Sequence, residues 1–195
     1  MKINKNFKIW KAIKEDEFRP AMEFIHFRNG YAYASDAHIL VKIPINELMD
    51  FSLDIERTPE ENLAILDGYS IHAKVWQHLA GVKGVIKLFP PQYENELPFF
   101  SVDIDSGGAQ VVRFPVAKKD FYKVPDFDGV LKPEANTETI SKIGISISLL
   151  NNLAQALGAE NLKLEFSAEN RKIIVRPLES ESMAYGLIMP RICVE

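Results

Sequence analysis

The amino-acid sequence predicts an α+β fold in which helices pack against antiparallel sheets. Two observations indicate this fold class. Three segments have the apolar spacing of an amphipathic helix, and each is followed by about three short runs rich in β-branched and aromatic residues. Short turn sequences join several of these runs, as they join antiparallel strands. The sequence therefore predicts three copies of one unit, a helix followed by about three strands. The copies share a hydrophobic pattern but not the same residues.

Capping and terminating residues support the second and third helices. The predicted helices are 7–18, 70–81 and 148–159. Ser70 and Ser148 can cap the second and third helices, and Gly81 and Gly158 can end them. In the first helix the apolar residues Ile9, Trp10 and Ile13 fall on one face.

The strands are predicted from their composition and from the turns between them. The predicted strands are 21–27, 31–35 and 38–43 in the first unit, 84–89, 98–104 and 109–116 in the second, and 161–167, 172–178 and 183–190 in the third. Asn29 and Gly30 predict a tight hairpin turn, and residues 105–108, Asp-Ser-Gly-Gly, predict another.

A segment rich in proline, aspartate and small polar residues, 124–144, predicts a linker between the second and third units. We place the boundary near Pro133, so residues 1–133 form a domain of two units and residues 134–195 a third, separate half-unit. Each unit presents one apolar helix face and one apolar sheet face, and two units can cover each other. The third unit has no companion, so it either folds back beside the first domain or pairs with its counterpart in a second chain.

Composition indicates an ordinary soluble globular protein. Of the 195 residues 47% are hydrophobic and 26% charged, and the formal net charge of −4 gives no overall basic field for nucleic acid. The single cysteine, Cys193, cannot form an internal disulfide, which fits a reducing compartment. No signal peptide and no membrane-spanning run is recognisable, so we expect a cytoplasmic protein.

The sequence offers weak signals for catalysis and none for a cofactor. The four histidines lack metal-ligand spacing, and neither a phosphate-binding loop nor a dinucleotide fingerprint is present. Ser35, Asp36 and His38 include the residue types of a catalytic triad, but strand alternation directs Ser35 away from the other two. Asp36 is more simply explained as a residue that caps backbone N–H groups in a bend between strands. The aspartate pairs 103/105 and 126/128 also lie at turns, where aspartate is common.

Three short motifs resemble the bacterial DNA polymerase sliding clamp, the ring-shaped β subunit, and they occur in the same order along the chain. Residues 32–41, AYASDAHILV, resemble the clamp segment A-T-D-G-H-R-L-A, and 124–133, VPDFDGVLKP, resemble F-P-D-Y-x-x-V-x-P. Residues 184–192, AYGLIMPRI, resemble the carboxyl-terminal Y-x-Y-V-V-M-P-M-R. The resemblance covers most of the chain and implies that it keeps the middle domain of a clamp and the last unit of the third.

The resemblance implies a non-enzymatic protein whose cleft docks linear peptides of polymerase or repair proteins. The implied cleft residues are Ser35, Ala37, His38, Ile39 and Leu40 on one wall, Pro125, Gly129 and Val130 on a second, and Leu187, Met189, Pro190 and Arg191 on a third. Several positions depart from the clamp pattern: Ala37 replaces glycine, Ile39 replaces arginine, and Gly129 replaces a residue that is often basic. The order of Arg191 and Ile192 is also inverted.

The resemblance further implies non-specific contact with the phosphates of duplex DNA through basic helix faces, and a homo-oligomer. The residues for such contact are Lys8, Lys11 and Lys14 on the first helix, and Lys74 and His78 on the second. Two alternatives stay open: a clamp-derived structural or regulatory module without DNA binding, and a hydrolase or metal-dependent nuclease that uses Asp36 and His38 with distant carboxylates.

Overall fold

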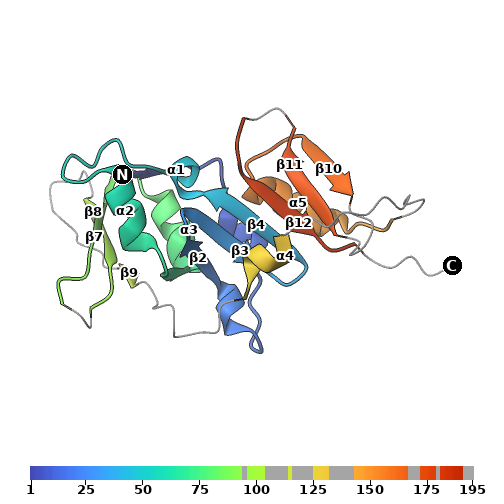
Figure 1. Ribbon diagram of the computed structural model, residues 1–195, viewed down its shortest axis with the longest axis horizontal. Helices are drawn as coiled ribbons and strands as arrows, with labels where there is room; N and C mark the ends of the chain where they lie inside the picture. Colours follow the sequence, from blue (N-terminus) through green and yellow to red (C-terminus); the bar gives the residue numbers. More distant parts are fainter. Residues whose placement is uncertain are drawn as a thin grey trace.

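The computed structural model describes residues 1–93, 96–103, 114–115, 125–131, 143–166, 172–178 and 181–190. Its largest element is a seven-stranded antiparallel sheet with strand order β10-β11-β12-β4-β3-β2-β6 (Figure 1). Its strands are β2 (Phe24–Arg28), β3 (Tyr31–Ser35), β4 (Ile39–Pro44), β6 (Ser70–His72), β10 (Leu162–Phe166), β11 (Ile173–Pro177) and β12 (Tyr185–Ile188). The α+β class predicted from the sequence is confirmed.

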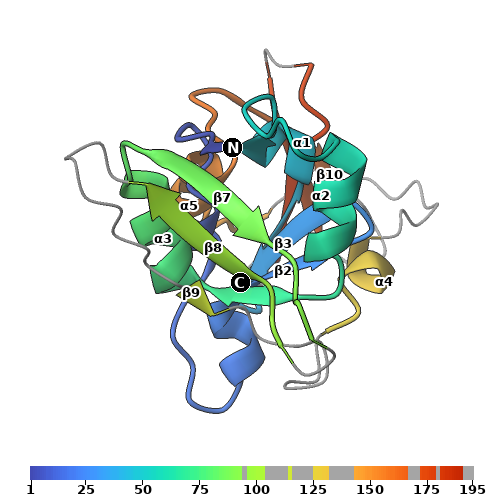
Figure 2. The same ribbon diagram turned by 90° about the vertical axis from the view of Figure 1, so that its left-hand side faces the viewer.

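Two smaller sheets complete the described strands. The three-stranded sheet has the order β7-β8-β9, and β1 pairs with β5 (Figure 2 views the molecule with β7 and β8 toward the reader). Their bounds are β1 Lys2–Ile3, β5 Met49–Asp50, β7 Val85–Phe89, β8 Phe99–Asp103 and β9 Phe114–Pro115. The predicted turn at 105–108, most of the predicted strand 109–116, Pro133, Arg191 and Cys193 lie outside the described residues.

The hairpin between β2 and β3 forms where the sequence predicts it. Asn29 and Gly30 have φ values of 51° and 78°, the left-handed conformations that a type I′ turn requires. Beyond the turn, His26 lies opposite Tyr33 and Arg28 opposite Tyr31.

The second and third predicted helices exist, but both begin at other residues. Helix α3 (Ala73–Gly81) begins after His72, whose Nδ1 accepts a hydrogen bond from the Lys74 N–H, because Ser70–His72 are already paired with β2 as β6. Helix α5 (Ile147–Ala156) follows Ser146 instead of Ser148. It ends at the predicted glycine, Gly158, which has a φ of +63°.

The prediction of a first helix over residues 7–18 is wrong. The chain forms one 3-10 turn, η1 (Ile9–Ala12), and Ile13 is extended. Residues 14–17, Lys-Glu-Asp-Glu, are polar, so no apolar stripe continues past Ile13 to hold a longer helix against the core. The remaining described helical elements are η2 (Pro20–Glu23), α1 (Ile45–Leu48), α2 (Pro59–Leu66) and α4 (Phe127–Leu131).

The third unit folds back beside the first and extends its sheet. Strand β12 pairs with β4, so that Tyr185 lies opposite Lys42 and Ile188 opposite Ile39. Helix α5 packs beside η1, and the Lys8 N–H donates to the Gln155 carbonyl at 3.1 Å. Residues separated by the whole second unit therefore share one continuous sheet.

The main core lies between the large sheet and the layer of η1, α3 and α5. Trp76 of α3 is fully buried. The centre of its ring lies 5.7 Å from that of Phe27 of β2 and 6.4 Å from that of Phe100 of β8. This one side chain joins the large sheet to the three-stranded sheet. In the described part of the chain, every helix is too short or too polar to cross a membrane.

Candidate functional site

The bend between β3 and β4 is held by Asp36. Its Oδ1 accepts hydrogen bonds from the backbone N–H groups of His38 at 2.9 Å and Ile39 at 2.8 Å, as the sequence predicts. The Ser35 hydroxyl donates to the Ile39 carbonyl at 2.8 Å and accepts from the Ala37 N–H. Ala37 has a φ of 72°, the left-handed conformation that favours glycine. Asp36 and Ser35 therefore form the bend through local bonds to the backbone.

Beyond the bend, strand alternation separates the apolar residues of β4 between two faces. Ile39 and Val41 lie in the main core, whereas Leu40 faces the opposite side of the sheet. Leu187 of β12 lies directly across from Leu40 and shares its face. The pairing of β4 with β12 thus brings the first and third implied walls together, but it directs Ile39 away from them.

Helix α4 covers this pair and forms a second, smaller core. We name it the α4 cluster, and its members are Tyr33, Leu40, Phe127, Leu131 and Leu187. The rings of Phe127 and Tyr33 stack, with 5.4 Å between their centres and an angle of 10° between their planes. Leu40 and Leu187 are only 4% and 2% exposed, because the helix lies over them. The chain's own helix therefore covers Leu40 and Leu187, two of the implied cleft residues.

Apolar residues remain exposed beside the α4 cluster. Val130 is 50% exposed and Met189 42%. The Met189 N–H donates to the His38 carbonyl at 2.9 Å, and the buried Lys172 donates through Nζ to the Val130 carbonyl at 3.0 Å. Ile173 pairs with Ile188, so the next pair in the same register sets Lys172 opposite Met189. These bonds join Met189 to His38 and Lys172 to Val130, and we name the three exposed residues His38, Val130 and Met189 the rim.

Two residues of the sheet fix α4 through one carboxylate. Asp128 accepts hydrogen bonds from the Lys42 ammonium and the Tyr33 hydroxyl, both at 2.8 Å. The hydrogen bond from Lys42 holds the pKa of Asp128 below its ordinary value, and burial raises the pKa of Tyr33 to about 12. The Lys42 ammonium also lies 4.3 Å from the centre of the Tyr31 ring. Position 128 thus anchors the helix that carries Val130.

The tight turn that starts α4 explains why position 129 is a glycine. The Asp126 carboxylate accepts a hydrogen bond from the Gly129 N–H at 2.9 Å, and a Cβ at Gly129 would overlap that carboxylate. A basic residue at this position, as in the clamp pattern, would require Asp126 to move. Pro125 precedes the helix and is partly buried.

The structure brings five of the twelve implied cleft residues to the α4 cluster or beside it. His38, Leu40, Val130, Leu187 and Met189 lie in or beside the α4 cluster, while Ser35 is buried in the bend. Pro190 follows Met189, and Arg191 lies outside the described residues.

Sequence reasoning missed the residues that hold the site together. They are Tyr33, Lys42, Phe127, Asp128, Leu131 and Lys172. The spacing of Phe127 and Leu131, four residues apart, was a usable signal for one face of a short helix. No local sequence pattern predicts the hydrogen bond from Lys172 to the Val130 carbonyl, because these residues are 42 positions apart.

The arrangement around Asp36 and His38 gives no support to hydrolysis. Asp36 directs Oδ1 at two backbone N–H groups, and His38 is exposed on the rim. Within the described residues, no three His, Cys, Asp or Glu side chains are close enough to hold a metal ion.

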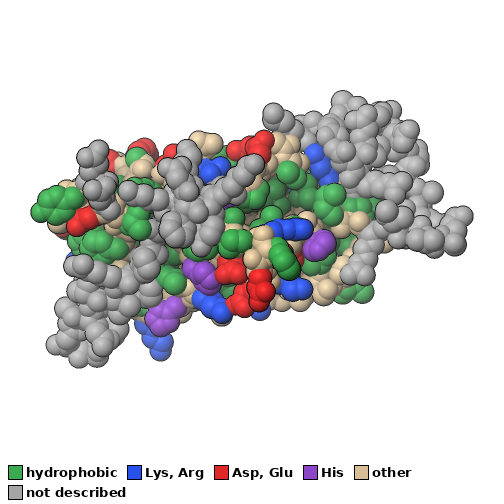
Figure 3. Space-filling model, turned by 90° about the horizontal axis from the view of Figure 1, so that it is seen from below, with side chains coloured by type: hydrophobic (Ala, Val, Ile, Leu, Met, Phe, Trp, Pro, Cys, Tyr) green, Lys and Arg blue, Asp and Glu red, His purple; other side chains and the backbone are tan. Residues whose placement is uncertain are grey.

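The residues implied to contact DNA lie on and around the helix layer, on the opposite side of the sheet from α4. Lys8, Lys11 and Lys14 are exposed; Lys8 precedes η1, and its carbonyl accepts a hydrogen bond from the Lys11 N–H at 2.8 Å. Lys74 forms an ion pair with Glu15. Figure 3 shows a face on which basic, acidic and histidine side chains lie beside one another. Of the residues implied to contact DNA, Lys74 thus has an acidic partner, Glu15.

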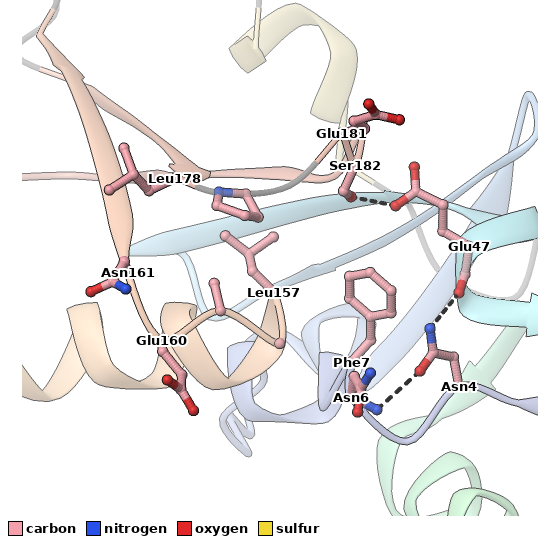
Figure 4. Close-up of a pocket in the computed structure, with 13 residues that line it drawn as sticks. Asn4, Asn6, Phe7, Glu47, Leu157, Glu160, Asn161, Leu178, Glu181 and Ser182 are labelled. Carbon is pink, nitrogen blue, oxygen red and sulfur yellow. Dashed lines mark hydrogen bonds between the residues drawn. The ribbon is translucent and has the colours of Figure 1, made fainter.

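A separate hollow of about 840 Å³ lies between the amino-terminal segment, the end of α5 and the loop before β12 (Figure 4). Its polar groups bond to one another: the Ser182 hydroxyl donates to the Glu47 carboxylate, and the Asn4 amide donates to the Glu47 carbonyl at 3.0 Å. None of the site residues implied by the sequence lines it. The bond from Ser182 to Glu47 joins the third unit to the first.

The repeated units and the sheet shared between the first and the third define the fold of a DNA clamp. The structure is similar to the β subunit of DNA polymerase III from Thermotoga maritima, with a TM-score of 0.55 and 11% sequence identity over 97% of this chain and 62% of that chain. It is also similar to the DNA polymerase sliding clamp from Bacillus subtilis, with a TM-score of 0.47 and 12% identity over 96% of this chain and 61% of that one.

The chain spans less than two thirds of the length of either solved structure. No family model matches the sequence, and no curated protein sequence matches it. At this level of identity the likeness to the Thermotoga protein shows the fold, and the fold confirms the resemblance seen in the sequence.

Proposed function

We propose that the protein is a non-enzymatic, clamp-like scaffold that docks a short apolar peptide of a replication or repair protein on the rim. The observation that carries this proposal is the convergence of Val130, Met189 and His38 from three segments far apart in the chain. The clamp fold supports the same function by analogy.

The chemistry of the rim suits an apolar ligand. Val130 and Met189 are apolar and half-exposed, and a methionine side chain adapts to ligands of different shape. The polar edge comes from His38. Burying two apolar anchors contributes about 3–6 kcal/mol before ordering costs, which corresponds to a dissociation constant of roughly tens of micromolar or weaker.

A titration tests the proposal. A fluorescently labelled clamp-binding peptide is titrated against the wild type, Met189→Asp and Met183→Asp. Met183 is also exposed but lies at the other end of β12, where its N–H donates to Glu47, so it is a matched control. We expect the Met189→Asp variant to bind about tenfold more weakly or worse, with no change for Met183→Asp. Equal binding by all three proteins, or binding by none, contradicts the proposal.

Contact with duplex DNA is a second candidate function, supported by the exposure of Lys8 and Lys11 at the start of η1. Non-specific contact depends on phosphate neutralisation, so the affinity should fall steeply with salt. The Lys8→Glu, Lys11→Glu double variant should lose most DNA retention at low salt, whereas Lys83→Glu, which changes an exposed lysine after α3, should not. Unchanged retention in the double variant favours a clamp-derived module without DNA binding.

A further inference from the structure

A group of charged and aromatic side chains lies on the large sheet beside the α4 cluster. Its members come from the neighbouring strands β10, β11 and β12 (Figure 1) and are Lys163, Glu165, Arg176 and Tyr185. Tyr185 packs against the α4 cluster, and the Arg176 guanidinium lies 4.8 Å from the centre of the Tyr185 ring. Arg176 in turn donates to Glu165 at 3.5 Å. We name these four connected residues the Arg176 site.

The Arg176 site carries more positive than negative charge. Lys163 and Arg176 share one carboxylate, that of Glu165, at 2.9 and 3.5 Å. The side chains of Lys163, Arg176 and Glu165 are 59%, 40% and 35% exposed, so a ligand can reach all three. The whole chain has a formal net charge of −4, and the local surplus is therefore opposite in sign to the rest. A surplus of this sign attracts an acidic ligand.

The guanidinium of Arg176 is placed to receive a second carboxylate. Its position over the Tyr185 ring is stabilised by a cation–π interaction. Among the described residues its acidic partner is Glu165 alone, and that contact uses Nε at the long limit of a hydrogen bond. The two terminal nitrogens can therefore bind another carboxylate in the bidentate geometry that arginine favours.

A partly exposed apolar residue, Ile174, lies between the rim and the Arg176 site. Ile174 is opposite Leu187 of the α4 cluster, whereas its two neighbours in β11 lie in the main core. Strand alternation sets Lys172, Ile174 and Arg176 on the same face. Lys172 donates to the carbonyl of Val130, a residue of the rim. This face of β11 therefore leads from the rim to the Arg176 site.

The distance between the rim and the Arg176 site fits a short extended peptide. Tyr185 begins β12, and Met189 directly follows the end of that strand. A strand rises about 3.3 Å per residue, so these two positions are roughly 13 Å apart. An extended ligand rises by the same amount, and its side chains at even spacing point to one face. A ligand residue about four positions from an anchor on Met189 therefore reaches Arg176.

We propose that a peptide docked on the rim continues along β11 and places a carboxylate on Arg176. The protein thus selects partners that carry an acidic residue about four positions from their apolar anchor. This inference rests on the proposed function, because the rim supplies the anchoring contacts. Ile174 offers an apolar contact to the residues in between, and the surplus charge favours an acidic ligand over a neutral or basic one.

Three labelled peptides test this selection. They share one apolar clamp-binding sequence and carry either glutamine at the positions about four residues before and after the anchor, or glutamate at one of these two positions. One glutamate peptide should bind the wild type about fivefold more tightly than the glutamine peptide at low salt. The gain should disappear in Arg176→Gln, which stays polar but loses the charge. It should increase in Glu165→Gln, which removes the competing carboxylate.

Charge exchange gives a second, independent readout. In Arg176→Glu the preference should invert, so that a peptide with lysine at the responsive position binds more tightly than the glutamine peptide. The control is Lys83→Glu, which changes the net charge by the same amount on an exposed loop after α3 and should keep the gain. Circular dichroism checks that each variant is folded.

The glutamine peptide separates this inference from the proposed function. If that peptide binds and Met189→Asp weakens its binding, equal affinity of all three peptides for the wild type overturns the inference alone. Binding by none of the peptides overturns both. A gain that persists in Arg176→Gln also overturns the inference. So does a single-stranded oligonucleotide that binds the wild type but not Arg176→Glu, because it assigns the Arg176 site to phosphates.

Discussion

The Lys42 ammonium lies 2.8 Å from the Asp128 carboxylate, across 86 residues of sequence, and this pair fixes α4 to the large sheet. The same carboxylate accepts the Tyr33 hydroxyl. One aspartate at the second position of a five-residue helix therefore sets the place of Phe127, Val130 and Leu131. Helix α4 is too short to be stable alone, so these contacts and the α4 cluster determine its position.

Replacing Asp128 with asparagine should destabilise the protein by about 1 kcal/mol, because the carboxylate is half-exposed and its pairing is partly screened. Urea unfolding of Asp128→Asn, Lys42→Met and the double variant gives the coupling between the two residues. We expect the double variant to lose less than the sum of the single losses. Strict additivity would contradict a direct interaction.

Replacing Ala37 with glycine should stabilise the protein by about 0.5–1 kcal/mol, because Ala37 has a φ of 72° that glycine adopts without steric cost. Thermal unfolding of the variant should show a raised midpoint. Ala34→Gly, at a buried position within β3, is the matched control and should lower the midpoint. A lower midpoint for Ala37→Gly would show that the bend does not impose this conformation in solution.

Stability should fall as the pH drops from about 6.5 to about 4, because of His26. Burial lowers the pKa of His26 to about 4. Its Nε2 lies 2.7 Å from the Ala21 carbonyl, which can only accept, so Nε2 carries the proton and Nδ1 accepts from the Ser70 hydroxyl at 2.7 Å. Below its ordinary pKa of about 6.5 the histidine is protonated in the unfolded chain and neutral in the folded one. The unfolded state therefore binds more protons, and acid favours unfolding.

The expected loss from this histidine is roughly 3 kcal/mol over that interval. Denaturant unfolding at a series of pH values measures it. His26→Gln can keep both hydrogen bonds without titrating, so its stability should change much less between pH 6.5 and 4. A wild type and a variant with parallel pH profiles would contradict the assignment.

Local sequence signals predicted most of the strands and two of the three helices. The hairpin at Asn29-Gly30 and the end of α5 at Gly158 depend on conformations that few residues adopt, so they could be found from the sequence alone. Helix α2 was also predictable, because Thr58 and Glu61 form a capping box, a pattern that the sequence displays.

The start of α3, helix α4 and the position of Ile39 could not be predicted from the sequence, because they depend on tertiary contacts. Ser70 was expected to cap a helix but pairs with His26 in the sheet, because strand addition at the edge of β2 outweighs the local cap. The linker interpretation of 124–144 missed α4, whose stability comes from Tyr33 and Leu40. The predicted bend at Asp36 is confirmed. Ile39 was expected in the cleft but lies in the main core, because the alternation of side chains along β4 directs it to that face of the sheet.

The most direct test of the account is a methyl spectrum of the protein labelled at its five methionines, recorded during titration with an apolar clamp-binding peptide. Met189 is half-exposed on the rim, Met183 is exposed at the far end of the same strand, and Met49 is buried. We predict that the Met189 methyl resonance shifts with increasing peptide and saturates, while those of Met183 and Met49 stay in place. A Met189 resonance that stays fixed at saturating peptide, or one that moves only together with Met183, would contradict docking on the rim.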